Sequence, residues 1–240
     1  MPSPIALGLG AALPVLLAYA GPAALASTPA NALVAVRKRL RDRRRVAITF
    51  DDGPQPQALE QFLRTLDDEA VRATFFIVGE QALRHPALVR QIHAAGHELG
   101  NHGFAHRNHL LRNPFGIATD IERGAQTIAE LVGARPALFR PPYGVVTAAT
   151  CLGAWRAQSR LVLWSRWGRD WRAAATPGSI ARSAVLRVRG GDIVLLHDAD
   201  HYASPGSWRN TLAALPRILE LVRALGLQPT PIGGPGGLTW

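Results

Sequence analysis

Two adjacent carboxylates follow the first apolar run after the N-terminal region. The run Val46–Phe50 leads directly into Asp51 and Asp52, and the following Gly53-Pro54 predicts a turn. Because neighbouring carboxylates repel each other, such a pair is expected to lie beside a cation. One carboxylate would then bind a metal while the other acts as a general base. On this dipeptide alone, capping of a helix by Asp is the simpler interpretation.

Two histidines stand four residues apart in a later segment, 101–106, which reads NHGFAH. One turn of helix would place the imidazoles of His102 and His106 on the same side. An Asp from another strand would complete a set of two His and one carboxylate that leaves positions open for water and substrate. The spacing is a weak signal by itself, because His97 and His109 make the whole stretch rich in histidine.

Two further polar groups follow apolar runs. Residues 140–144 read RPPYG, a stiff segment in which Arg140 could orient a carboxylate and the Tyr143 backbone N–H could face an oxyanion. An ordinary loop with Arg140 in a surface ion pair is the alternative. The run Ile193–Leu196 ends in His197, which is well placed for a general acid, although a structural histidine fits the pattern too.

Three indoles surround one acid in the segment 164–171, WSRWGRDW. Trp164, Trp167 and Trp171 would suit a wall for sugar binding beside Asp170. Tryptophans packed into a core are the competing interpretation.

Short apolar runs alternate with helical periods from Val46 onward. The predicted strands are Val46–Phe50, Ala73–Val78, Glu98–Asn101, Ala137–Arg140, Leu161–Trp164, Ile193–Leu196 and Leu227–Pro229. The predicted helices are a segment around Leu59 to Leu66, then Pro86–Ala95, Gly116–Leu131, Val146–Ala157, Ser179–Val188 and Leu212–Leu225. This alternation predicts an α/β fold with a parallel sheet, closed or nearly closed into a barrel. Active sites of such barrels form at the carboxyl ends of the strands, where the polar residues above lie.

Composition excludes several classes of protein. Of 240 residues, 48% are hydrophobic and 18% are charged, which rules out disorder over the whole length. No Gly-X-Y period, heptad or longer repeat is present, so collagen, coiled coil and solenoid are excluded. The single Cys151 cannot form an internal disulfide or a cysteine-rich zinc cluster. Any metal must therefore be bound by His and carboxylate.

The N-terminal region has no charged side chain before Arg37 and is almost wholly apolar over residues 5–26. We predict a signal or membrane-anchor segment over 1–36, a basic linker over 37–45 and one catalytic domain over 46–240. The linker carries +6 of the net charge of +10, so the remaining chain is only mildly basic and nucleic acid binding is not expected. The missing basic n-region and the basic run after the apolar segment argue against ordinary export.

Five segments resemble, in order, the motifs of the polysaccharide deacetylases, carbohydrate esterase family four, which share a NodB-homology domain. Residues 49–53 match T-F-D-D-G, 102–106 resemble H-[S/T]-x-x-H, 140–144 look like R-P-P-Y-G, 170–171 match the end of D-x-x-D-W, and 195–197 match L-x-H. The resemblance covers about residues 46–227 and implies a distorted (β/α)7 barrel.

The resemblance implies a role for each matching residue. Asp51 would be the catalytic base, Arg140 would orient it, the Tyr143 backbone amide would bind the oxyanion, and His197 would protonate the leaving amine. The residues implied to hold one divalent metal are Asp52, His102 and His106. Zinc is the first choice, and cobalt, manganese and iron also fit the ligand set. The residues implied to line the pocket for the acetyl methyl group are Trp171 and Leu195.

Two positions depart from the family pattern. Gly103 stands where Ser or Thr is usual, which removes a hydroxyl near the ligands. Trp167 stands where the first Asp of D-x-x-D-W is expected, so Asp170 or Asp198 must tune the pKa of His197. Asp170 is accordingly included among the expected catalytic residues.

The function implied is hydrolysis of N-acetyl groups on N-acetylglucosamine-type glycans, peptidoglycan or chitin-like, with release of acetate. We expect a monomer that acts outside the cytoplasmic membrane at the cell wall, anchored or secreted through its N-terminal segment. Two alternatives stay open. A non-haem iron oxygenase could use the same ligands, although Asp51 beside Asp52 counts against it. An inactive carbohydrate-binding module would have no need of a base and an acid together.

Overall fold

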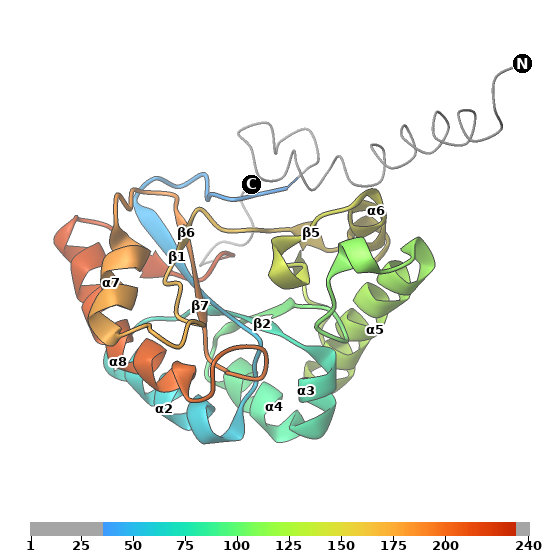
Figure 1. Ribbon diagram of the computed structural model, residues 1–240, viewed down its shortest axis with the longest axis horizontal. Helices are drawn as coiled ribbons and strands as arrows, with labels where there is room; N and C mark the ends of the chain where they lie inside the picture. The colour runs from blue at the N-terminus through green and yellow to red at the C-terminus, as the bar shows by residue number, and fades with distance from the viewer. Residues whose placement is uncertain (1–35, 234–240) are drawn as a thin grey trace, which may run out of the picture.

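The computed structural model describes residues 36–233, which form an α/β fold around one parallel sheet (Figure 1). The strands are β1 (Arg45–Asp51), β2 (Thr74–Ile77), β3 (Glu98–Asn101), β4 (Leu138–Phe139), β5 (Arg160–Leu161), β6 (Arg166–Trp167), β7 (Ile193–His197) and β8 (Gln228–Thr230). Their order is β5-β4-β3-β2-β1-β7-β6, with β8 paired to the start of β1. The sheet is curled into a half-barrel that is open between β5 and β6, so the predicted barrel-type fold is confirmed.

The helices surround the sheet on its outside, in the arc that Figure 1 shows from α7 through α2 to α6. They are α2 (Pro56–Asp68), α3 (Gly79–Arg84), α4 (Pro86–Ala94), α5 (Pro114–Val132), α6 (Ala148–Arg156), α7 (Pro177–Val185) and α8 (Ser207–Ala224), with short 3-10 helices η2 (His109–Leu111) and η3 (Pro142–Gly144). None of the helices within residues 36–233 is long and apolar enough to cross a bilayer.

The central strands are buried on both faces, as expected for continuous apolar runs in a parallel sheet. Outside the sheet, Phe50 of β1 packs edge-on against Phe62 of α2, with ring centroids 5.2 Å apart, and lies 5.0 Å from Phe75 of β2. Leu59 and Leu66 recur with Phe62 at helical spacing and are buried on the same face of α2. This packing fixes β1, whose carboxyl end carries the two adjacent aspartates.

Every predicted strand and helix has a counterpart in the structure, but one helix and one strand were missed, besides the two short 3-10 helices. The short helix α3 starts two residues after β2 and spans six residues, too few for a helical period to be recognised. The strand β6 consists of Arg166 and Trp167 alone and has no apolar run to mark it. Both elements are held by their neighbours in the fold.

Residues 36–45 lie against the barrel. Arg37 forms a parallel bridge with Val162 after β5, and Arg39 forms an antiparallel bridge with Asp192 before β7. The side chains of Val36 and Leu40 are buried in the core. This stretch therefore contacts the chain next to β5 and next to β7. The predicted signal or anchor segment lies outside the described residues, except for Val36.

Candidate active site

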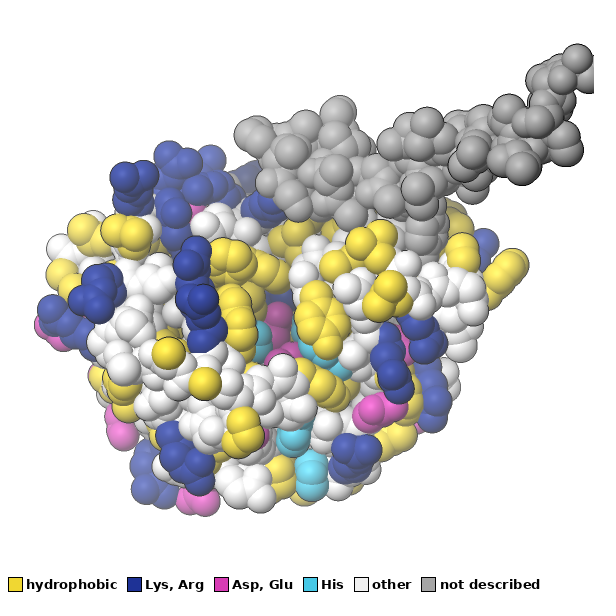
Figure 2. Space-filling view, in the orientation of Figure 1, with side chains coloured by type: hydrophobic (Ala, Val, Ile, Leu, Met, Phe, Trp, Pro, Cys, Tyr) yellow, Lys and Arg dark blue, Asp and Glu magenta, His cyan; other side chains and the backbone are white. Residues whose placement is uncertain are grey.

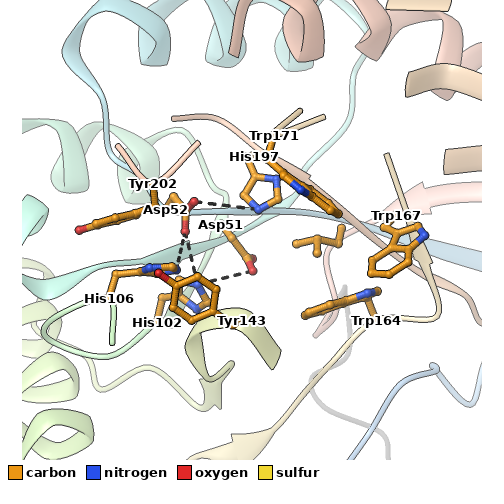
Figure 3. Close-up of a pocket in the computed structure, with 11 residues that line it drawn as sticks. Asp51, Asp52, His102, His106, Tyr143, Trp164, Trp167, Trp171, His197 and Tyr202 are labelled. Atoms are coloured by element: carbon orange, nitrogen blue, oxygen red, sulfur yellow. Dashed lines mark ion pairs between the residues drawn. The ribbon is translucent and has the colours of Figure 1, made fainter. Parts of the chain in front are cut away.

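All the predicted site residues except Arg140 and Asp170, which are buried behind it, line one cavity at the carboxyl ends of the strands, with a volume of about 290 Å³. It is lined by Asp51, Asp52, His102, His106, Tyr143, Trp164, Trp167, Trp171, Leu195, His197 and Tyr202. Figure 2 shows a hollow with apolar side chains at its rim and histidine and acidic side chains at its bottom. Figure 3 shows how these side chains point into the cavity from different elements.

Both aspartates at the end of β1 are buried, at 3% and 4% exposure. Asp51 pairs in register with His197 on the neighbouring β7, which brings the two ends of these strands to the same depth. Asp52 has a φ of 80°, a left-handed conformation that costs energy for a residue other than glycine. Neither aspartate caps α2, whose N-cap residue is Gln55, so the helix-cap interpretation is wrong.

Asp52, His102 and His106 form a cluster in which one ligand atom from each lies within 4.8 Å of the other two. Asp52 Oδ1 is 3.2 Å from His106 Nε2 and 3.5 Å from His102 Nε2. Burial alone would raise the pKa of Asp52, but the nearby imidazoles of His102 and His106 and the charge of His197 hold it well below its usual range. Asp52 is therefore an anion aimed at two ring nitrogens.

The two histidines converge without the helical turn that their spacing suggested. Residues 102–106 form an irregular loop, so the predicted helical turn is wrong. Asp120 of α5 holds this loop, accepting hydrogen bonds from the backbone N–H groups of Phe104 at 2.9 Å and Ala105 at 3.0 Å. Gly103 has a φ of 84°, and a Cβ there would lie 2.7 Å from Asp120 Oδ2. The loop therefore explains why a glycine occupies this position.

Arg140 links the two sides of the cavity floor. Its side chain is fully buried and donates to Asp51 Oδ1 at 2.6 Å and to Thr49 Oγ1 at 2.9 Å. Its carbonyl oxygen lies 2.7 Å from His102 Nδ1, which turns the Nε2 atom of that ring toward Asp52. The alternative of a surface ion pair for Arg140 is wrong, because its partner Asp51 is buried as well.

His197 reaches the cavity from the end of β7 and is held by Asp170. Its Nδ1 lies 2.9 Å from Asp170 Oδ1, and its backbone N–H donates to Asp170 Oδ2 at 2.7 Å. Thr211 of α8 donates to the same Oδ2 at 2.9 Å. Burial alone would lower the pKa of His197, but the charge and hydrogen bond of Asp170, with Asp52 and Asp51 nearby, raise it to about 10. His197 is thus a protonated group at neutral pH.

Asp198 takes no part in holding His197. Both of its carboxylate oxygens are buried without a hydrogen-bond partner, and a Cβ on Gly53 would lie 2.4 Å from Asp198 Oδ2. Burial, with the negative charges of Asp52 and Asp51 nearby, raises the pKa of Asp198 to about 8. Of the two acids considered for tuning His197, Asp170 is the one in contact with its ring.

Aromatic side chains form one wall of the cavity. Trp164 and Trp171 are half-buried, and Trp167 is 36% exposed, so all three indoles line the cavity, while Trp164 also packs against the core. Trp167 lies 6.2 Å from Trp164 and 5.7 Å from Trp171 between ring centroids. Leu195 lines the cavity with them.

Tyr143 lies on the other side of the cavity, next to the histidine cluster. Its ring is 59% exposed and meets His106 edge-on at 4.5 Å between centroids. Its φ of 58° is again a left-handed conformation for a residue other than glycine. Whether its backbone N–H binds an oxyanion stays a prediction.

Three residues that support the site were missed in the sequence. Tyr202 stacks on His106, with ring centroids 4.0 Å apart and an angle of 12° between the planes. Asp120 and Thr211 act through the loop of His106 and through Asp170, respectively. The position of Tyr202 shortly after His197, beyond a strand end, was the one available signal; the other two lie within ordinary helical periods.

His97 and His109 have structural roles. His97 Nδ1 accepts a hydrogen bond from the Ala73 backbone N–H at 3.2 Å, and His109 Nδ1 lies 2.9 Å from Thr150 Oγ1. Burial lowers the pKa of each to about 4, so both are neutral packing groups outside the cavity.

The arrangement combines the parts that amide hydrolysis requires. An anionic cluster with two imidazoles can hold a divalent cation, and Asp51 lies beside it as an acceptor for a proton. His197, protonated at neutral pH, can donate a proton to a leaving group.

Comparison with known proteins agrees with this chemistry. The sequence profile of the polysaccharide deacetylase family matches residues 38–162. The chain is 39% identical over 185 residues to a peptidoglycan-N-acetylglucosamine deacetylase of Bacillus cereus, covering 76% of this chain and 84% of the relative. It is 35% identical over 199 residues to a chitooligosaccharide deacetylase of a Bradyrhizobium strain, covering 80% and 88%.

A solved structure shares the fold as well. The crystal structure of a peptidoglycan N-acetylglucosamine deacetylase in complex with 4-naphthalen-1-yl-N-oxidanyl-benzamide superposes with a TM-score of 0.76 at 26% identity. The superposition covers 83% of this chain and 91% of that one. With the profile match and the two relatives, this chain belongs to the polysaccharide deacetylase family.

Proposed function

We propose that this protein is a metal-dependent deacetylase that hydrolyses N-acetyl groups of N-acetylglucosamine-type glycans, peptidoglycan or chitin-like, and releases acetate. The observation that carries the proposal is the position of Asp51, which contacts Arg140 and lies 3.7 Å from His102 at the edge of the histidine cluster. His197 faces the same cavity from β7 (Figure 3). The family membership and the activities named for the two relatives support this function.

The cluster fits a divalent metal. Asp52 Oδ1 is buried close to two imidazole nitrogens, yet it forms no hydrogen bond of acceptable geometry. A lone pair left in this way, beside two imidazole nitrogens, is what a cation requires. Asp52, His102 and His106 would hold it, with zinc as the first choice for this set of donors. When bound, the metal would polarise the acetamide carbonyl and make a water molecule more acidic.

Asp51 would act as the base. The bond from Arg140 holds Oδ1, which leaves Oδ2 directed toward the cluster as the acceptor of a proton from water. Because Arg140 is buried and its guanidinium also bonds Thr49, the carboxylate has little freedom to rotate. The backbone N–H of Tyr143 would share the negative charge that develops on the acetyl oxygen.

His197 would act as the acid. Its Nδ1 carries a proton toward Asp170, so Nε2–H is the group available to the leaving nitrogen. The raised pKa keeps His197 protonated until the C–N bond breaks. In each turnover Asp51 would take a proton from water, and His197 would give one to the leaving nitrogen. Trp171 and Leu195 would enclose the acetyl methyl group and exclude water from the C–N bond.

The test is release of acetate by the purified protein after addition of metal, measured across peptidoglycan, chitin oligomers and other N-acetylated glycans. We expect release from at least one of them, and about 1,000-fold slower release from the Asp51→Asn variant. A folded protein with bound metal that releases no acetate from any glycan would falsify the proposal. That result would favour an inactive carbohydrate-binding module of the same fold, which the aromatic wall alone would suit.

We further propose that the domain acts outside the cytoplasmic membrane, as a monomer anchored or secreted through its N-terminal segment. The support is chemical: peptidoglycan, named for one relative, lies there. Protease treatment of intact cells tests this, because an external domain is digested before the membrane is broken. Protection until lysis would contradict an external location.

A further inference from the structure

A second cavity adjoins the catalytic one on the β6 and α7 side of the molecule. Its volume is about 380 Å³. It is lined by Ser165, Arg166, Trp167, Arg169, Ser179, Arg182, Ser183 and Leu186, and we call it the arginine cleft. Trp167 lines both cavities. The two cavities therefore lie against the same indole.

The arginine cleft is positively charged, and among residues 36–233 no acidic side chain lines it. Arg166 is committed to the fold, because it pairs with the buried Asp192 at 3.0 Å and donates to the Arg187 carbonyl at 2.7 Å. Arg169 and Arg182 are exposed, and within residues 36–233 neither forms an ion pair with a carboxylate. Figure 2 shows Lys and Arg side chains beside the apolar rim of the hollow on this side. Two guanidinium groups are thus available to an external anion.

Arg169 is held at the outer edge of the aromatic wall. Its guanidinium carbon lies 5.1 Å from the Trp167 ring centroid, within the range of a cation–π contact. Its φ of 56° is a left-handed conformation that an arginine adopts only where the surroundings impose it. Trp167 in turn contacts Trp171, which lies beside His197. The wall therefore runs without interruption from the acid to this arginine.

We infer that the arginine cleft is a subsite for a carboxylate borne by the glycan next to the sugar that is deacetylated. The inference rests on the proposed function and narrows it: the preferred substrate class is an acidic N-acetylated glycan of the peptidoglycan type, not a neutral chitin-type polymer. Guanidinium groups bind carboxylates through paired hydrogen bonds, which a neutral hydroxyl cannot match. A cleft that shares Trp167 with the catalytic cavity suits a substituent of the same chain of sugars.

The test compares one glycan in two charge states. A peptidoglycan fragment with free carboxylates and the same fragment with its carboxylates amidated are assayed with the wild type and with Arg169→Gln/Arg182→Gln. The matched control is Arg90→Gln/Arg156→Gln, which removes two exposed arginines that line neither cavity.

We expect the wild type to prefer the acidic fragment by about tenfold in kcat/KM, mainly through a lower KM. The cleft variant should lose this preference, so that the ratio of the two substrates falls to about one, whereas the control variant should keep it. Equal kcat/KM for both fragments in the wild type, or equal loss on both in the cleft variant, overturns the inference while deacetylation itself stands.

Binding measurements distinguish a failure of the carboxylate subsite from a failure of the proposed deacetylase function. Calorimetry with the Asp51→Asn variant measures the affinity for each fragment without turnover. Carboxylate-dependent binding that requires Arg169 and Arg182, in a protein that deacetylates no glycan, would support the subsite and refute the proposed function. Loss of binding to vesicles of anionic lipid in the cleft variant, with unchanged affinity for the acidic fragment, would make the cleft a membrane contact and overturn the inference.

Discussion

The two sides of the catalytic cavity use histidine in opposite ways. On the β3 side, the Nδ1 atom of His102 meets the carbonyl oxygen of Arg140, which fixes the ring but carries no full charge. On the β7 side, the Nδ1 atom of His197 meets the carboxylate of Asp170, which holds a proton on the ring. The same side chain is thereby suited to bind a metal in one place and to deliver a proton in the other. The partner of the second nitrogen decides the chemistry.

Replacing a metal ligand in one variant and the base in another should separate metal binding from catalysis. These two variants should show the largest losses of activity. His102→Ala should lose both activity and metal, because two ligands cannot hold the ion tightly. Asp51→Asn should lower kcat by about 1,000-fold but keep the metal, because it removes only the base. Metal analysis beside acetate release checks both variants. Equal loss of metal in the two variants would contradict this division of roles.

Replacing Asp170, the partner of His197, with a neutral residue tests the role of the acid on the β7 side of the cavity. Asp170→Asn should lower kcat by about 100-fold, because the acid loses the charge that keeps it protonated. The raised pKa of His197, about 10, should fall in the variant, so its activity should be lost at a lower pH than that of the wild type. The pH dependence of kcat measures this shift. If kcat declined at the same high pH in the variant and the wild type, another group would be the acid.

The same pair should also affect stability as a function of pH. Because the pKa of His197 is raised in the folded protein, its stabilising effect is complete below about 6.5 and is lost as the pH rises toward about 10. Thermal melting over this range should show a loss in the wild type that is smaller in Asp170→Asn. An equal loss in both proteins would assign it to other groups.

The loop that carries His106 can be tested through its glycine. Gly103→Ala should destabilise the fold by about 1–3 kcal/mol, because it adds a Cβ at a φ of 84° and 2.7 Å from Asp120 Oδ2. The control is Gly133→Ala, where φ is 75° and no atom lies within 4 Å of the added carbon. Denaturant unfolding of both variants separates backbone strain from the clash. Equal losses would show that Asp120 moves aside freely.

The smallest effect is expected at Tyr202. Tyr202→Ala removes the ring that stacks on His106 and should weaken metal affinity by about tenfold, since it leaves that ligand free to reorient. Tyr202→Phe keeps the ring and should stay within about twofold, because the hydroxyl makes only a 3.4 Å contact with Gln81. Competition with a chelator measures both affinities. Equal weakening in the two variants would assign the effect to the hydroxyl.

The sequence predicted the site better than it predicted the supports of the site. The candidate catalytic residues lie at strand ends, where a polar side chain that follows an apolar run can be recognised from the sequence alone. The helical turn predicted for His102 and His106 was wrong, because spacing alone does not show that Asp120, far along the chain, holds an irregular loop. The sequence identified Asp170 and Asp198 as candidates for tuning the pKa of His197 but could not decide between them. The decision depends on which carboxylate reaches the His197 ring. Contacts of this kind are made only by the folded chain.

The close approach of Gly53 and Asp198 sets an order on the changes that this site could accept in evolution. A side chain at position 53 would collide with the carboxylate of Asp198, whose two oxygens would lie 2.4 and 2.7 Å from the new carbon. Shortening Asp198 first would open that space, whereas replacing Gly53 first would force either the Asp198 side chain or the turn that presents Asp52 to shift. The two positions are therefore expected to be epistatic: a substitution at 53 should cost less stability in a descendant that has already lost the acid at 198.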